Sequence, residues 1–150
     1  MTQVTSCEVP EGSLLAQYGG LQDYRDCFAR EVPGEVTLSQ YIERFYSSIA
    51  FGPERVILRL IGRGASPDNI RALARGDSDR IAVWEVIERT PDQILLLSKD
   101  TNTASWLSTQ TVEGSTNLMF GSWVGGIEQS GWRVMLAPHV WYSRLLLGAV

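Results

Sequence analysis

The chain has 150 residues, 44% of them hydrophobic, and a formal charge of -4 from 13 basic and 17 acidic side chains. This composition predicts one soluble domain whose core needs neither disulfides nor a structural metal. No apolar stretch approaches the roughly 20 residues of a membrane span, and an acidic chain with scattered arginines is a poor partner for nucleic acid. The first twenty residues lack the features of a secretory signal, so we expect a cytoplasmic protein.

The N-terminal part of the chain shows little regular pattern. Residues 1–22 contain glycines and a proline without a sustained hydrophobic period, which predicts an irregular N-terminal arm. Residues 23–32 alternate between two sets of side chains, as a first strand does, and Pro33 and Gly34 end it. No repeat, low-complexity tract or charge block divides the remainder, so 23–150 is expected to form a single domain.

The next segment has the spacing of helices. Thr37 and Gln40 form a capping box before a helix over 38–48, in which apolar residues recur at three- and four-residue steps. A second helix is expected over 53–62, with a proline at its first position and glycine at its end. A short third helix is expected over 69–75.

From residue 80 onward, short runs rich in Val, Ile, Trp and Thr alternate with turn residues, which is typical of antiparallel strands. The expected strands cover 80–89, 93–99, 103–112 and 116–124. Their connections are short enough for hairpins, so these strands form a meander. Residues 132–147 are expected to form a final helix that Pro138 interrupts. The fold class is therefore α+β, with an antiparallel sheet wrapped around a C-terminal helix and two to three short helices after the first strand.

Five stretches mark the successive parts of this arrangement: DYRDCFAREVPG, RIAVWEVIERT, SWLSTQTVEG, LMFGSWV and HVWYSRLLL. With the order of strand, helix pair, meander and long helix, they resemble the helix-grip fold of the START-like superfamily, which includes polyketide cyclases and lipid-transfer domains. Within it, the chain looks like a group of small bacterial proteins of unknown function. The resemblance covers most of 23–150 and implies a cavity between the sheet and the C-terminal helix. The superfamily commonly has more strands than the five expected here.

Large aromatic side chains lie on the expected strands and on the final helix. Period two places Trp106 with small and hydroxylated residues, a mixture that favours a cavity over a solid core. An arginine on the second helix could hold a ligand carboxylate in a two-pronged hydrogen bond, although a surface ion pair is its more common role. The side chains that we expect to contact a ligand are Trp84, Trp106, Phe120, Arg59 and Tyr142.

Two titratable residues are weak candidates for acid-base catalysis. Glu85 is in phase with Ile81 and Val83, and burial in such an apolar setting would raise its pKa. The alternative is that Glu85 lies on the outer face, paired with Arg89 or a neighbouring strand. His139, the single histidine, is either a general base that faces the cavity or a partly buried side chain bonded to a backbone carbonyl.

Metals and cofactors are not expected. The glycine-rich phosphate loops, the nucleophile elbow and the zinc-protease signature are all missing. The two cysteines, Cys7 and Cys27, have no Cys or His neighbour at metal-ligand spacing. Without an export signal, we expect them to be reduced thiols.

The leading hypothesis is a small-molecule-binding domain that holds an apolar or aromatic ligand between the sheet and the C-terminal helix. One alternative is an enzyme of the cyclase, dehydratase or hydrolase kind that uses a cavity carboxylate or His139. Another is an interaction protein whose core is filled by its own side chains. Apolar residues on both faces of 93–99 and 116–124 suggest that a second copy covers the outer face, which predicts a homodimer.

Overall fold

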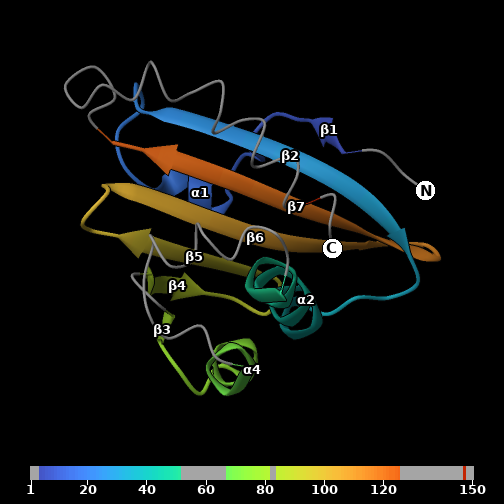
Figure 1. The fold of residues 1–150 in the computed structure, drawn as a ribbon. Helices are drawn as coiled ribbons and strands as arrows, with labels where there is room; N and C mark the ends of the chain where they lie inside the picture. Colours follow the sequence, from blue (N-terminus) through green and yellow to red (C-terminus); the bar gives the residue numbers. More distant parts are fainter. Residues whose placement is uncertain (1–3, 52–66, 82–83, 126–146, 148–150) are drawn as a thin grey trace.

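A computed structural model describes residues 4–51, 67–81, 84–125 and 147. Its centre is a seven-stranded antiparallel sheet in the order β1-β2-β7-β6-β5-β4-β3 (Figure 1). The strands are β1 (Thr5–Ser6), β2 (Tyr24–Pro33), β3 (Arg80–Ile81), β4 (Trp84–Arg89), β5 (Gln93–Ser98), β6 (Thr103–Val112) and β7 (Ser115–Val124). The helices of the described residues are α1 (Leu14–Gln17), α2 (Leu38–Phe51) and α4 (Pro67–Arg75).

The α+β class and the antiparallel meander expected from the sequence are confirmed. Two differences raise the number of strands from the five expected to the seven found in the described ranges. The stretch expected as one strand over 80–89 is divided into β3 and β4, which pair with each other. The N-terminal arm also adds β1, which pairs with β2 at the sheet edge.

The arm at 1–22 is therefore more regular than expected. Its strand has two residues and its helix α1 has four, and neither is long enough to show a hydrophobic period. The hydroxyl of Ser13 begins α1 by accepting a hydrogen bond from the backbone N–H of Ala16 at 3.2 Å.

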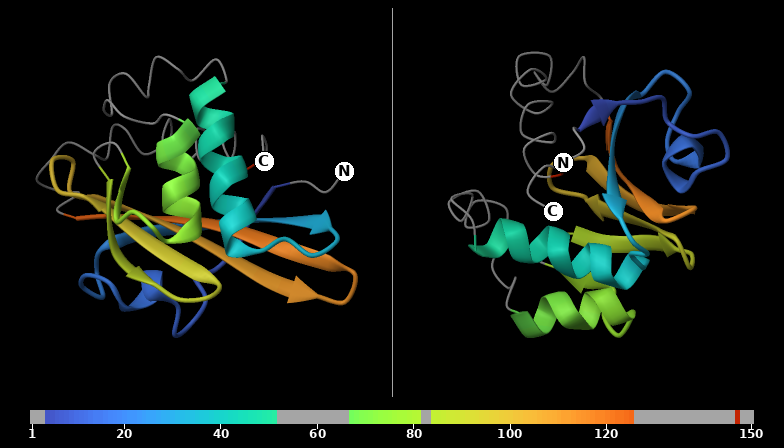
Figure 2. Two further views of the ribbon diagram at one scale, coloured as in Figure 1. Left: turned by 90° about the horizontal axis from the view of Figure 1, so that it is seen from below. Right: turned by 90° about the vertical axis from the view of Figure 1, so that its right-hand side faces the viewer.

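Different parts of the chain cover the two faces of the sheet. Figure 2 shows α2 and α4 packed side by side on one face and α1 on the other. These faces are named the α2 face and the α1 face. Alternate residues of each strand contribute to one or the other, as in β6, where Leu107 belongs to the α2-face core and Trp106 to the α1-face core.

Helix α2 begins with the expected capping box. The backbone N–H of Gln40 donates to Thr37 Oγ1 at 3.2 Å, and the backbone N–H of Thr37 donates to Gln40 Oε1 at 3.0 Å. Four residues of the expected apolar stripe are buried, namely Leu38, Tyr41, Ile42 and Phe45, whereas the side chain of Ile49 lies outside the described part. The expected third helix is α4, whereas the helices expected over 53–62 and 132–147 lie outside the described residues, apart from Leu147.

The α1 face is covered by the chain's own arm. Leu14 and Leu15 of α1 are buried against Trp106 and other apolar residues of β5 to β7. Gln93 of β5 links the arm to the sheet, because its Oε1 accepts hydrogen bonds from the Leu14 N–H of α1 and from Trp106 Nε1 of β6, both at 3.0 Å. The homodimer was expected because a second copy could cover the outer apolar face. The arm of the same chain covers apolar residues of this face, so the face no longer argues for a second copy. The homodimer itself stays a prediction.

Candidate functional site

The α2 face of the sheet changes from apolar to polar along its strands. Beneath α2, four side chains lie in register across β2, β7, β6 and β5: Phe28, Phe120, Leu107 and Ile94. Towards the start of β2, the next two rows also hold Leu96 and Val124, but most of their side chains carry hydroxyl or carboxyl groups. The polar side chains of these rows, here named the polar patch, are Tyr24, Asp26, Ser98, Thr103, Ser105 and Ser122.

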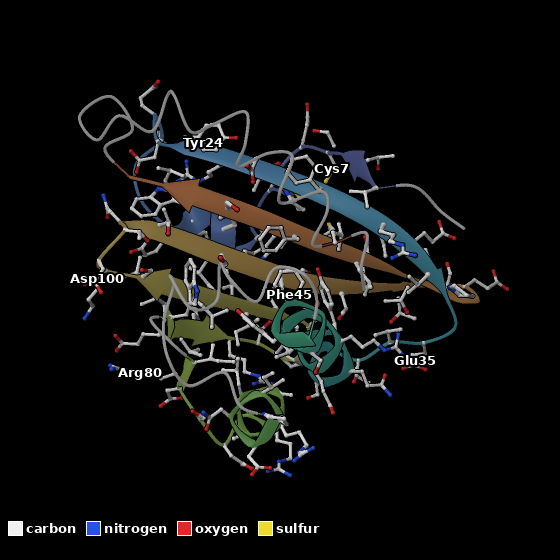
Figure 3. The ribbon with its side chains drawn as sticks, in the orientation of Figure 1. Cys7, Tyr24, Glu35, Phe45, Arg80 and Asp100 are labelled. Carbon is white, nitrogen blue, oxygen red and sulfur yellow. The ribbon has the colours of Figure 1, made fainter. Side chains whose placement is uncertain are left out.

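The polar patch consists of cross-strand neighbours. Asp26 lies opposite Ser122, which lies opposite Ser105 on its other side. In the row beyond, Val124 separates Tyr24 of β2 from Thr103 and Ser98. Figure 3 shows Tyr24 at the start of β2, away from Phe45 of α2. The antiparallel pairing thus gathers residues that are almost a hundred positions apart in the sequence.

Several hydroxyl groups of the patch are removed from solvent. Ser98 is 0% exposed and Ser122 2% exposed, whereas Tyr24, Asp26 and Ser105 are half-buried. Ser98 Oγ has no hydrogen-bond partner within the described part of the chain. A buried hydroxyl without a partner costs about 1–3 kcal/mol, so such a group usually meets another polar atom.

Tyr24 and Asp26 form the strongest polar contact of the patch. They are two residues apart on β2, so their side chains share a face. Tyr24 Oη donates to Asp26 Oδ2 at 2.9 Å. Burial, the negative charge of Asp26 and this hydrogen bond together raise the pKa of Tyr24 well above its ordinary value. Tyr24 is therefore a protonated donor throughout the physiological pH range.

Two of the expected ligand-binding aromatics lie at the borders of the polar patch. Phe120 precedes Ser122 on the same face of β7 and stacks on Phe45 of α2, with ring centroids 5.0 Å apart. Trp84 of β4 lies beside Ser98, as follows from the pairing of Glu85 with Leu97. Trp84 is half-buried and packs against the α2-face core.

Trp106 is not brought together with these aromatics. It is 1% exposed on the α1 face, where it packs in the cluster that includes Leu15. The sheet therefore separates Trp106 from Trp84 and Phe120. A ligand held on the α2 face could not contact all three, so Trp106 would not share a site there with Trp84 and Phe120.

Glu85 lies on the outer face of β4. Its carboxylate is 3.5 Å from Lys99 Nζ and 3.7 Å from an Arg80 nitrogen, and its side chain is 38% exposed. Ile81 belongs to β3 and pairs with Trp84, so the alternation expected to place Glu85 beside Ile81 does not continue from β3 into β4. The arrangement is the alternative considered above, in which neighbouring strands supply the partners of Glu85.

The remaining expected site residues, Arg59, His139 and Tyr142, lie outside the described residues. The polar patch itself was missed, although one signal was available. Tyr24 and Asp26 are spaced two apart on a correctly expected strand, which puts a phenol and a carboxylate on one face. The serines could not be added without the pairing of β2 with β7.

In the ranges that the structure describes, His, Cys, Asp and Glu side chains do not gather in groups of three that could hold a metal ion. None of the helices described there combines the length and the apolar character that crossing a membrane requires. Comparison of the chain with family models, with curated proteins and with solved structures gave no match. A function must therefore be inferred from the side chains themselves.

Proposed function

We propose that the chain binds a small molecule over the polar patch, on the α2 face of the sheet. The observation that carries this proposal is the fully buried Ser98 hydroxyl, which has no partner in the described part of the chain and lies beside the half-buried ring of Trp84. A flat ring that packs on Trp84 and offers a polar atom to Ser98 would satisfy both groups.

The side chains of the patch indicate the chemistry of the ligand. Five of the six carry hydroxyl groups, the sixth is the carboxylate of Asp26, and none is a cation. An anionic ligand would face Asp26 without a compensating charge from the patch, which costs free energy in a half-buried setting. We therefore infer a neutral or cationic ligand with an apolar or aromatic body and hydrogen-bonding groups at one end.

The proposal includes a helix-grip arrangement of the START-like kind, with the C-terminal helix over the sheet. Leu147 supports it, because this residue near the C-terminal end is 0% exposed in the α2-face core. Its carbonyl oxygen accepts a hydrogen bond from Arg30 Nη1 at 3.4 Å. Leu147 therefore lies on the same face of the sheet as the polar patch, which is the face that the C-terminal helix would cover in the proposed helix-grip arrangement.

Native mass spectrometry of gently purified protein, followed by organic extraction, tests the binding function. We expect a co-purified species, released by organic solvent, with an aromatic or apolar body and no net negative charge. The same spectrum gives the oligomeric mass and so tests the predicted homodimer. A ligand-free mass, together with no thermal stabilisation by a panel of neutral and cationic aromatic compounds, would overturn the proposal.

A pair of matched variants places the ligand on the sheet. Ser105→Phe fills the centre of the polar patch, because Ser105 of β6 lies beside Ser122 of β7. Thr111→Phe adds the same ring to the same face of the same strand, at an exposed residue beyond α2. The bound species should be lost from Ser105→Phe and retained by Thr111→Phe. Retention by both variants would place the ligand elsewhere.

The Tyr24–Asp26 hydrogen bond favours a second candidate function, proton transfer on the bound molecule. Asp26 would accept a proton from an acidic C–H of the ligand, and the single O–H of Tyr24, released from Asp26 as this carboxylate is protonated, would turn to donate to the ligand oxygen on which charge develops. The extracted molecule, incubated with the protein in heavy water, should then exchange that hydrogen for deuterium, and Asp26→Asn should abolish the exchange. Binding without exchange would leave the chain a binding protein.

A further inference from the structure

The two thiols of the chain touch each other across the sheet edge. Cys7 follows β1 directly and lies opposite Cys27 of β2, next in the register that pairs Ser6 with Phe28. The backbone N–H of Cys7 donates to the Cys27 carbonyl at 3.0 Å, and the two Sγ atoms are 3.0 Å apart. Both cysteines are free thiols. Figure 3 shows Cys7 beside β2, at the edge that β1 forms.

We propose that Cys7 and Cys27 form a reversible disulfide through exchange with a small-molecule disulfide such as glutathione disulfide. Directly opposed residues of antiparallel strands have Cα atoms about 4.5–5.5 Å apart, within the range of about 4.4–6.8 Å that disulfides span. The sulfur atoms need only approach to about 2.05 Å, which side-chain rotation supplies without a shift of the backbone.

The accessibility of the two thiols sets the order of the steps. Cys7 is half-buried, whereas Cys27 is 2% exposed, and burial raises the pKa of the Cys27 thiol. Cys7 loses its proton to water and its thiolate attacks a sulfur of glutathione disulfide; the glutathione S–S bond breaks, and one glutathione leaves as a thiolate that takes up a proton from water. Cys27 then loses its proton to water and attacks the Cys7 sulfur, and the second glutathione leaves. The two cysteines are oxidised, and one disulfide is reduced to two thiols.

The disulfide would control how firmly the arm is held on the sheet. The covalent loop from Cys7 to Cys27 contains α1, whose Leu14 and Leu15 cover the α1-face core. In the reduced chain, the short strand β1 and the side chains of α1 hold the arm. In the oxidised chain, the arm cannot leave β2 even when these contacts open.

The full-length reduced protein, incubated with glutathione disulfide under native conditions, tests the proposal. Intact-mass spectrometry should show the loss of two hydrogen atoms, and peptide mapping without reductant should find Cys7 joined to Cys27. Dithiothreitol should restore the original mass. A folded protein whose thiols stay unmodified, or a stable glutathione adduct on the wild-type chain, would overturn the proposal.

Single-cysteine variants test which of the two thiols attacks glutathione disulfide first. Cys27→Ser removes the resolving thiol, so it should accumulate one glutathione on Cys7. Cys7→Ser leaves the buried thiol alone and should react far more slowly. Tryptophan fluorescence checks that both variants are folded. Equal reaction rates of the two variants would exclude Cys7 as the residue that meets the small disulfide.

Discussion

Leu15 of α1 packs on Gly121 of β7, where the sheet presents no side chain. A Cβ atom at Gly121 would overlap Leu15 Cδ2 and would lie 2.8 Å from the Asp26 carbonyl oxygen and 3.1 Å from Trp106 Cε3. Glycine therefore makes the room in which Leu15 becomes 0% exposed. The arm is part of the core through this contact, although its sequence shows little regular pattern.

Replacing Gly121 by alanine tests this contact. We expect Gly121→Ala to lower the free energy of unfolding by about 1–3 kcal/mol, the usual cost of overpacking, because α1 or β2 must shift. Urea unfolding followed by tryptophan fluorescence measures the change. Gly20→Ala is the control, because a Cβ there meets only Asp23, at 3.4 Å or more. Equal stability of the two variants would show that the close approach of α1 is not a constraint.

Arg89 of β4 holds the C-terminal end of α4. Gly76, with φ 83°, ends the helix, and the backbone N–H of Gly76 donates to the Leu73 carbonyl at 3.1 Å. The Arg89 guanidinium donates to the carbonyls of Leu73 and Ala74, each at 2.6 Å. A cation at this position also interacts favourably with the helix dipole.

Loss of this guanidinium should remove the hydrogen bonds that join the end of α4 to β4. We expect Arg89→Gln to lower the free energy of unfolding by about 1.5–3 kcal/mol, the range for hydrogen bonds to charged groups. Arg75→Gln is the matched control, because Arg75 belongs to α4 but forms an exposed ion pair with Asp77. Such a pair contributes about 0–1 kcal/mol. A loss in Arg75→Gln as large as that in Arg89→Gln would count against the proposed role of Arg89.

The sequence predicted most strands because two signals agree along them. In 103–112 and 116–124, alternating side chains end at turn residues, so bounds and pairing follow from local chemistry alone. The prediction of one strand over 80–89 was wrong, because the alternation of side chains does not continue from Ile81 into β4. For this reason the sequence pattern allowed an apolar face for Glu85 as one of two alternatives, and the structure has the other, with Lys99 and Arg80 as its partners.

The candidate site needed information that local patterns lack. Period two shows that Trp106 and Ser108 share a face, but not which face of the sheet they occupy. That choice depends on where α1 and α2 pack, and α1 has only four residues. The register of β2 on β7 joins distant parts of the chain, so the neighbours of Asp26 could be found only in the folded structure.

Asp23 should make the stability of the protein depend on pH under acidic conditions. Its Oδ2 accepts hydrogen bonds from the Gly20 N–H at 2.7 Å and from Trp123 Nε1 at 2.9 Å, and these bonds lower the pKa of Asp23. A carboxyl group with a lowered pKa stabilises the folded state above its ordinary pKa of 3.8, and this stabilisation is lost as the pH falls through the folded-state pKa.

The measurement compares wild type with Asp23→Asn in urea unfolding at a series of pH values. Wild type should be the more stable protein above about pH 4, and the difference should shrink as the pH falls further. Asp100→Asn changes an exposed carboxylate near the turn before β6 and should leave the wild-type pH profile unaltered. A difference between wild type and Asp23→Asn that stays constant with pH would rule out the titration of Asp23 as its cause.

The Tyr24–Asp26 contact predicts a second pH dependence, under alkaline conditions. Burial and the Asp26 charge raise the pKa of Tyr24 above its ordinary value of 10.0. The protonated phenol therefore gives the folded state its full stability below pH 10. This contribution is lost as the pH rises through the folded-state pKa, because Tyr24 of the unfolded chain releases its proton at a lower pH. Tyr24→Phe cannot ionise, so its stability should decline less steeply than that of wild type above about pH 10.

Asp26→Asn separates the two causes of the raised pKa. Asparagine keeps a side-chain oxygen that can accept the Tyr24 hydrogen bond but removes the negative charge, so the Tyr24 pKa should fall part of the way towards 10.0. Unfolding free energies at several alkaline pH values would then decline over a narrower range in Asp26→Asn than in wild type. An unchanged profile would mean that the negative charge of Asp26 contributes nothing to the raised pKa of Tyr24, which would then come from burial and the hydrogen bond.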